Sequence, residues 1–177
     1  MRIVLTTAGL AVGLVAAALA TQAPTQKPAA EHARLAAFAG QWLYTGAAKA
    51  SPLGPAGKVT STETCEWFEG AFHLVCRAKG TGPKGPMTGM SVMGYDPARK
   101  AYTYHAITSH GDNIFVRGKV AGKVWTWSDE TTVDGKAVKI LVTVTEQTPS
   151  AYGVKVEASM DNAPLMLVEE GTSTKQP

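Results

Sequence analysis

The chain is poor in the residues that mark several specialised classes of protein. Charged residues make up 18% of its 177 positions and aromatic residues 7%. Lysines and arginines are scattered along the chain and do not form clusters, and the formal net charge is +3, so the sequence gives no sign of the basic surface of a nucleic-acid-binding protein. This length accommodates one domain of ordinary size plus a targeting segment. We therefore expect a single domain and no nucleic-acid partner.

The short motifs of common catalytic and cofactor sites are also missing. The sequence has no Gly-x-Ser-x-Gly motif, and the glycine-rich stretch 80–89 lacks the Lys-Ser/Thr ending and the strand-to-helix context of a phosphate loop. His105, His110 and Asp112 lie close in sequence and carry groups that bind zinc, but no further ligand stands at a matching spacing. We predict no catalytic motif, no metal site and no cofactor.

The amino terminus has the pattern of a secretory signal. A basic start is followed by an uncharged run through Ala20 that ends in a small-x-small cleavage sequence at 18–20. We predict a signal peptide over 1–20, a flexible leader over 21–28 and a periplasmic or secreted bacterial protein with no stable membrane insertion after cleavage. The alternative is an uncleaved anchor, because the run approaches the ~20 residues that span a bilayer.

Residues 29–177 are predicted to form one all-β domain with a short helix at its start. Strong helix formers fill 29–38 and Gly40 ends that stretch, whereas turn residues divide the rest into short runs of alternating polarity. Such spacing is typical of an antiparallel sandwich or barrel. The ten expected strands begin near Gln41, Lys58, Phe72, Thr88, Ala101, Asn113, Val124, Ala137, Tyr152 and Leu165.

One hairpin has a register that the sequence defines. Gly70-Ala71 is a two-residue loop with glycine first, as a type II′ turn requires, and it places Cys65 directly opposite Cys76. Facing cysteines in an oxidising compartment are expected to form a disulfide, and two buried free thiols are the alternative. The same register directs Glu63 and Trp67 to the cysteine face of the sheet.

Several motifs resemble known families. The sequence Phe-Ala-Gly-Gln-Trp at 38–42 is similar to the Gly-x-Trp start of lipocalin-like (calycin) barrels. The stretches 65–70, 75–76, 93–96 and 118–127 resemble a bacterial family, domain of unknown function fifteen seventy-nine. The resemblance covers roughly residues 35–175, nearly the whole predicted mature chain.

The resemblance implies an antiparallel, up-and-down, lipocalin-like barrel of about ten strands. It further implies that a short helix closes one end and that Trp42 packs beneath the floor. Lipocalin-like proteins often cover this tryptophan with a basic residue near the carboxyl end, and Lys175 is the only one that the chain offers there. The resemblance brings no established reaction with it.

The candidate ligand-binding residues are side chains expected to face the barrel interior. An inward carboxylate such as that of Glu63 needs a partner or a purpose, unless it is solvated at the rim. Paired aromatic and methionine side chains on one strand face fill a core or line a binding site. The glycine- and proline-rich stretch 80–89 is predicted to be a flexible loop at the rim. The candidate residues are Glu63, Trp67, Met90, Tyr104, Trp125 and Trp127.

Three functions are compatible with these features. The first is a binding module that holds a small hydrophobic ligand inside the barrel. The second is an envelope interaction or structural protein with a filled barrel, and the third is an enzyme that uses an inward acid such as Glu63. An empty apolar cavity favours the first, an exposed apolar patch over a packed interior favours the second, and a perturbed acid favours the third.

Overall fold

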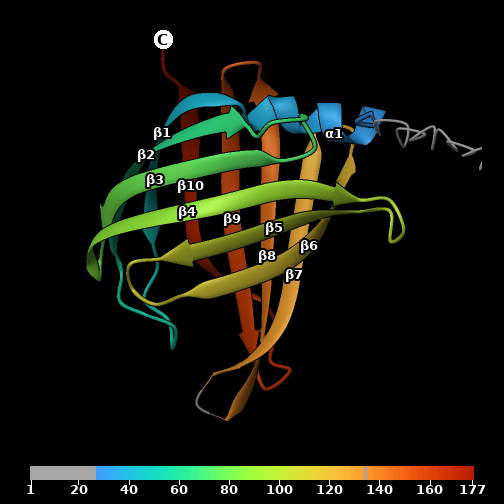
Figure 1. Cartoon of the computed structure of the whole chain (residues 1–177). Helices are drawn as coiled ribbons and strands as arrows, with labels where there is room; N and C mark the ends of the chain where they lie inside the picture. The colour runs from blue at the N-terminus through green and yellow to red at the C-terminus, as the bar shows by residue number, and fades with distance from the viewer. Residues whose placement is uncertain (1–26, 134) are drawn as a thin grey trace, which may run out of the picture.

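The chain forms a short helix followed by a ten-stranded sheet that closes on itself (Figure 1). The computed structural model describes residues 27–133 and 135–177, so the predicted signal peptide lies outside the described residues. The elements are α1 (Ala30–Arg34), the 3-10 helix η1 (Leu35–Phe38), β1 (Gly40–Ala48), β2 (Gly57–Trp67), β3 (Leu74–Gly82), β4 (Gly85–Asp96), β5 (Ala101–Thr108), β6 (Asn113–Ala121), β7 (Val124–Val133), β8 (Lys136–Thr148), β9 (Ala151–Met160) and β10 (Met166–Lys175).

The sheet is an up-and-down barrel. Each strand pairs antiparallel with its sequence neighbours, and β10 returns to pair with β1. The register places Trp42 opposite Lys175 on one side and opposite Glu63 on the other. The predicted fold class is confirmed, and every predicted strand start lies within three residues of the observed one.

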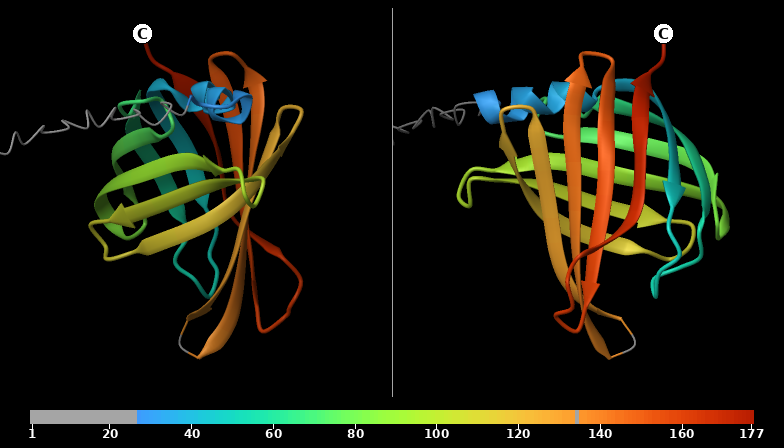
Figure 2. Two further views of the ribbon diagram at one scale, coloured as in Figure 1. Left: turned by 45° about the vertical axis from the view of Figure 1, so that its right-hand side comes forward. Right: turned by 180° about the vertical axis from the view of Figure 1, so that it is seen from behind.

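The two ends of the barrel differ. At the closed end, α1 and η1 lie across the opening, as the views in Figure 2 show. The other end, which we call the open end, carries the connections 49–56, 83–84, 109–112 and 161–165. Among the described residues, neither helix has the length and apolar character needed to cross a membrane.

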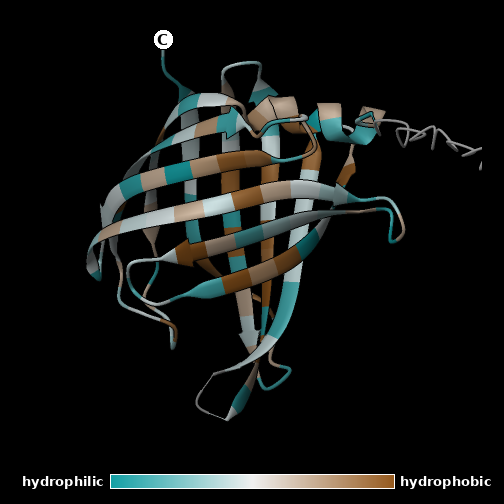
Figure 3. Ribbon diagram, viewed as in Figure 1, coloured by the Kyte–Doolittle hydropathy of each residue, from teal (hydrophilic) through white to brown (hydrophobic). Residues whose placement is uncertain are grey.

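Alternating side chains explain why the strands form a barrel. In β2, half-buried and exposed positions alternate from Gly57 to Thr64, so one side of the strand faces the interior and the other faces solvent. Apolar and polar residues are interspersed along the strands in the same way in Figure 3. Burying one face of each strand against the interior is the principal stabilising contribution of this pattern.

The connection between β2 and β3 is longer than predicted. The N–H of Phe68 donates to the carbonyl of His73 at 2.9 Å, and the N–H of Ala71 donates to the carbonyl of Phe68 at 2.9 Å. Gly70 and Ala71 both have positive φ, at 84° and 56°, whereas a type II′ loop needs this only at its first residue. The loop is centred on the predicted pair of residues, so Cys65 still faces Cys76 as expected.

The predicted flexible loop over 80–89 is wrong. Strand β3 continues to Gly82 and β4 begins at Gly85, which leaves only Pro83 and Lys84 between them. The structure explains why position 80 is a glycine within the strand. A Cβ atom there would collide with the backbone carbonyl of Thr60 and with Ser61. Glycine at this position therefore permits close contact between strands instead of mobility.

Candidate functional site

The barrel contains a cavity of about 540 Å³. Its aliphatic walls come from β6, β8 and β9, and its aromatic surface comes from η1, β1, β5, β7 and β9. The side chains therefore do not fill the barrel interior completely. The apolar lining consists of Phe38, Trp42, Ala78, Met93, Ile114, Val116, Trp127, Ile140, Val142, Val144, Val154 and Val156, together with the rings of Tyr44, Tyr104 and Tyr152.

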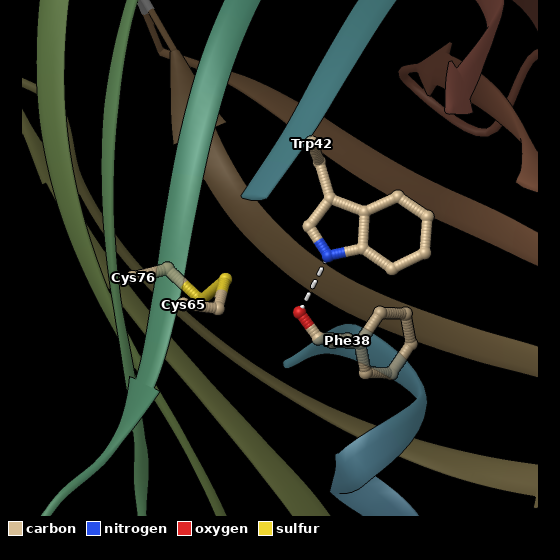
Figure 4. Close-up of a disulfide and its surroundings, with 4 residues drawn as sticks. All are labelled: Phe38, Trp42, Cys65 and Cys76. Carbon is tan, nitrogen blue, oxygen red and sulfur yellow. Dashed lines mark hydrogen bonds between the residues drawn. A yellow bond between two sulfur atoms is a disulfide. The ribbon is translucent and has the colours of Figure 1, made fainter. Parts of the chain in front are cut away.

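Trp42 forms the floor of this cavity, as the resemblance implied. Its side chain is 2% exposed, and its indole N–H donates to the carbonyl oxygen of Phe38 at 2.8 Å (Figure 4). The ring of Tyr152 lies 4.6 Å from the Trp42 ring, and Lys175 Nζ lies 5.4 Å from it. The floor is thus fixed both to the helix and to the last strand.

The predicted disulfide is present. Cys65 and Cys76 are bonded, with their Cα atoms 4.0 Å apart, and both are buried in the cluster that contains Phe38 and Trp42 (Figure 4). The bond links β2 to β3 beside the floor. It stabilises this end of the barrel by restricting the unfolded chain.

Trp125 does not line the cavity, contrary to the prediction. It is fully buried at the closed end, where its indole N–H donates to Glu146 Oε1 at 2.7 Å. Arg34 of α1 lies over the Trp125 ring at 5.4 Å and pairs with Glu146 at 2.9 Å. Trp125 therefore binds the helix to the sheet, while Trp127, two residues further on, reaches the cavity.

Trp67 and Met90 also lie outside the cavity. Trp67 is the last residue of β2, beyond the floor, and is 36% exposed. Met90 is 40% exposed on the outer face of β4, whereas Ser91, Met93 and Gly94 are the buried positions of this strand. The sequence left the facing of β4 ambiguous because apolar residues occupy both of its faces.

Glu63, Tyr104 and Trp127 are the predicted residues that the structure brings to the cavity wall. Glu63 projects from β2, and its register partner on β1 is the floor residue Trp42. Burial raises the pKa of the Glu63 carboxyl above its ordinary value of 4.5. Within the described part of the chain, no group donates a hydrogen bond to this carboxylate or forms a salt bridge with it.

Two further carboxyl groups, Glu169 and Asp129, line the same cavity. The hydroxyl of Tyr44 donates to Glu169 Oε1 at 2.8 Å. Burial, this hydrogen bond and the negative charge of Glu169 raise the pKa of Tyr44 far above its ordinary value. Burial likewise raises the pKa values of Tyr104 and Tyr152, so all three tyrosines are neutral at physiological pH.

A second hollow of about 400 Å³ lies at the open end. It is lined by the β1–β2 connection 49–56 and by the β3–β4 turn, and it includes Lys49 and Lys84. The two hollows are adjacent, because four residues line both of them: Tyr44, Ser61, Val156 and Glu169. We call the second hollow the mouth of the cavity.

The histidines considered as metal ligands do not converge. His105 Nε2 contacts Asn113 Oδ1 at 2.8 Å on an exposed part of β5, whereas His110 Nε2 contacts the carbonyl of Pro86 at 3.0 Å at the open end. Asp112 accepts a hydrogen bond from Thr108 Oγ1 at 2.6 Å. Each side chain thus has a local structural partner.

A family model described as "Protein of unknown function (DUF1579)" matches residues 27–161. The chain belongs to the DUF1579 family. The resemblance inferred from the motifs around the cysteines and tryptophans is thereby confirmed. No curated protein matches the chain.

Two solved structures resemble this DUF1579 protein in fold. One is an S-type phycobiliprotein lyase, CPES, from Guillardia theta, at 10% identity and a TM-score of 0.57, covering 83% of this chain and 93% of that one. The other is Rv2717c from M. tuberculosis, at 14% identity and a TM-score of 0.60, covering 85% of this chain and 100% of that one. At such low identities the similarity establishes a shared lipocalin-like barrel.

Sequence reasoning missed most polar residues of the cavity in this DUF1579 protein, among them both of the further carboxyl groups. Asp129 could have been found, because it continues the inward alternation of Trp125 and Trp127 along β7. Glu169 could not, because the pairing of β10 with β9 shifts between Leu167 and Glu169 and alters which side chains face inward. Tyr44, the hydrogen-bond partner of Glu169, carried no separate signal.

Proposed function

We propose that this protein is an exported binding module that holds one small, largely apolar molecule inside its barrel. The observation that carries the proposal is the cavity of about 540 Å³ with aliphatic and aromatic walls. Its volume falls in the range of roughly 300–1,000 Å³ that is typical of small-molecule sites. Apolar surface buried in such a site contributes about 25 cal/mol per Å², so binding requires few polar contacts.

Export is part of the proposal and is supported by two features. The first is the basic start, uncharged run and cleavage sequence within residues 1–20. The second is the Cys65–Cys76 disulfide, a bond that persists in oxidising compartments. Amino-terminal sequencing of the periplasmic or secreted protein should begin at Thr21. Recovery of the intact leader in membranes would favour the anchor instead.

Tryptophan emission provides a direct test of binding. Titration with a neutral probe, dodecanol, should change the emission of Trp127, since this indole lies on the cavity wall. The variant Trp127→Phe should reduce that change, and Trp42, the other tryptophan on the cavity wall, should report what remains. Trp67→Phe is the matched control, because Trp67 lies outside the cavity and its removal should leave the ligand-dependent change intact.

A blocking variant tests whether the cavity is the binding site. Ala78 lies on the cavity wall, so Ala78→Phe should fill part of the space and weaken dodecanol binding by about 10-fold or more, which is ~1.4 kcal/mol. Thr62→Phe places the same side chain on the exposed face of β2 and should have no effect. Equal affinity in both variants, or no binding to the unaltered protein, would refute the proposed function.

A further inference from the structure

The cavity has an asymmetric set of charges. Glu63, Asp129 and Glu169 contribute carboxyl groups to its wall. Among the described residues that line it, there is no lysine, arginine or histidine. The basic residues of this region, Lys49, Lys84 and His110, line the mouth. The charged groups that a ligand inside the barrel meets on the described wall are therefore all carboxyl groups.

Glu63 occupies the deepest polar position of the three. It pairs in register with the floor tryptophan Trp42, and the Tyr152 ring lies 4.6 Å from that tryptophan. A buried carboxylate without a partner is unfavourable, and a cation placed beside it would offset that penalty. The faces of aromatic rings also attract cations. Lys175 already lies over the Trp42 ring, so Glu63 and the rings of Tyr104 and Tyr152 are the groups of the cavity wall that can receive a positive group.

The tyrosines of the cavity report the same negative environment. The charge of Glu63 contributes to the raised pKa values of both Tyr104 and Tyr152, although burial is the larger cause for each. The Tyr44 hydroxyl already donates a hydrogen bond to Glu169 Oε1 at 2.8 Å. A carboxylate ligand entering this space would face repulsion from Glu63 with no basic side chain on the cavity wall to balance it.

We infer that the ligand of this cavity is an amphiphile with a cationic amine or quaternary ammonium head, which lies against Glu63 among the aromatic rings of the cavity wall, and is not a fatty acid. The inference rests on the proposed function, because it specifies the ligand of the same cavity. An anionic amphiphile would have to keep its head at the mouth, beside Lys84.

Three amphiphiles with the same alkyl tail test the inference. Dodecyltrimethylammonium, dodecanol and dodecanoate are titrated into the full-length purified protein below their micellar concentrations, with tryptophan emission as the readout. The ammonium compound should bind about 10-fold or more tightly than dodecanoate. Its affinity should rise with pH as Glu63 ionises, since the charge of the quaternary head is independent of pH.

Variants separate the role of Glu63 from that of general charge. Glu63→Gln should weaken dodecyltrimethylammonium binding by about 10-fold and leave dodecanol binding unchanged. Glu66→Gln removes an exposed carboxylate from the outer face of the same strand and should change neither affinity.

Each other outcome has a defined meaning. If dodecanoate binds most tightly and Lys84→Ala weakens it, the head lies at the mouth and the inference is overturned while the proposed function stands. Equal binding of all three compounds, insensitive to Glu63→Gln, has the same consequence. If dodecanol and the two charged compounds all fail to bind, both the inference and the proposed function are refuted.

Discussion

The closed and open halves of the barrel are built from the same strands but are packed differently. At the closed end, Leu35 and Phe38 enter from the helix and meet Leu74 and Trp125, all of which are buried. Toward the open end, inward side chains such as Val142 face the cavity. The difference shows that a ten-stranded barrel is too wide for its own side chains to fill. The interior is closely packed only at the closed end, where the side chains of Leu35 and Phe38 enter it.

We expect side chains of the closed half to contribute more to the free energy of unfolding than those of the open half. Leu35→Ala should lower the free energy of unfolding by about 3 kcal/mol, because it removes a fully buried side chain from a packed cluster. Val142→Ala should cost about 1 kcal/mol or less, because the space beside Val142 is already open. Urea unfolding followed by circular dichroism measures both. Equal losses would mean that the closed end is not the stabilising half.

Removal of the disulfide also tests the difference between the closed and open halves, with a smaller expected effect on stability. Its removal in the double variant Cys65→Ala/Cys76→Ala should cost about 2–3 kcal/mol, since the bond closes a short loop of the unfolded chain. The melting temperature should fall by several degrees. Dodecanol affinity of the folded variant should stay unchanged, because neither cysteine lines the cavity. A large loss of affinity would show that the floor and the cavity are mechanically coupled.

The smallest expected effect comes from Glu63 and depends on pH. Its pKa is raised in the folded protein, so the folded state binds the proton more tightly and stability falls as pH rises above the ordinary value of 4.5. Glu63→Gln should therefore stabilise the unliganded protein at neutral pH and give no gain at lower pH, where both forms are neutral. Unfolding measured across this pH range, with Glu66→Gln as the control, checks the sign.

Local sequence patterns predicted most of the fold. The hairpin of β2 and β3 kept its register even though its loop is longer than expected, because alternation and the facing cysteines constrain the pairing independently of the turn. The position of Trp125 against the helix, outside the cavity, could not be predicted. Whether an inward tryptophan lines a cavity or packs against a helix depends on how deeply the helix enters the barrel, and strand periodicity contains no information on that depth.

The pairing of β1 with β10 is the step that closes the barrel. The two strands pair at seven positions, from Trp42–Lys175 to Ala48–Glu169, so the barrel joins residues near opposite ends of the domain. Contacts between such distant residues form late in folding, because the intervening chain must first be ordered. Until residues 169–175 pair with β1, the sheet cannot close into a barrel. The last strand is therefore required before the cavity of about 540 Å³ exists.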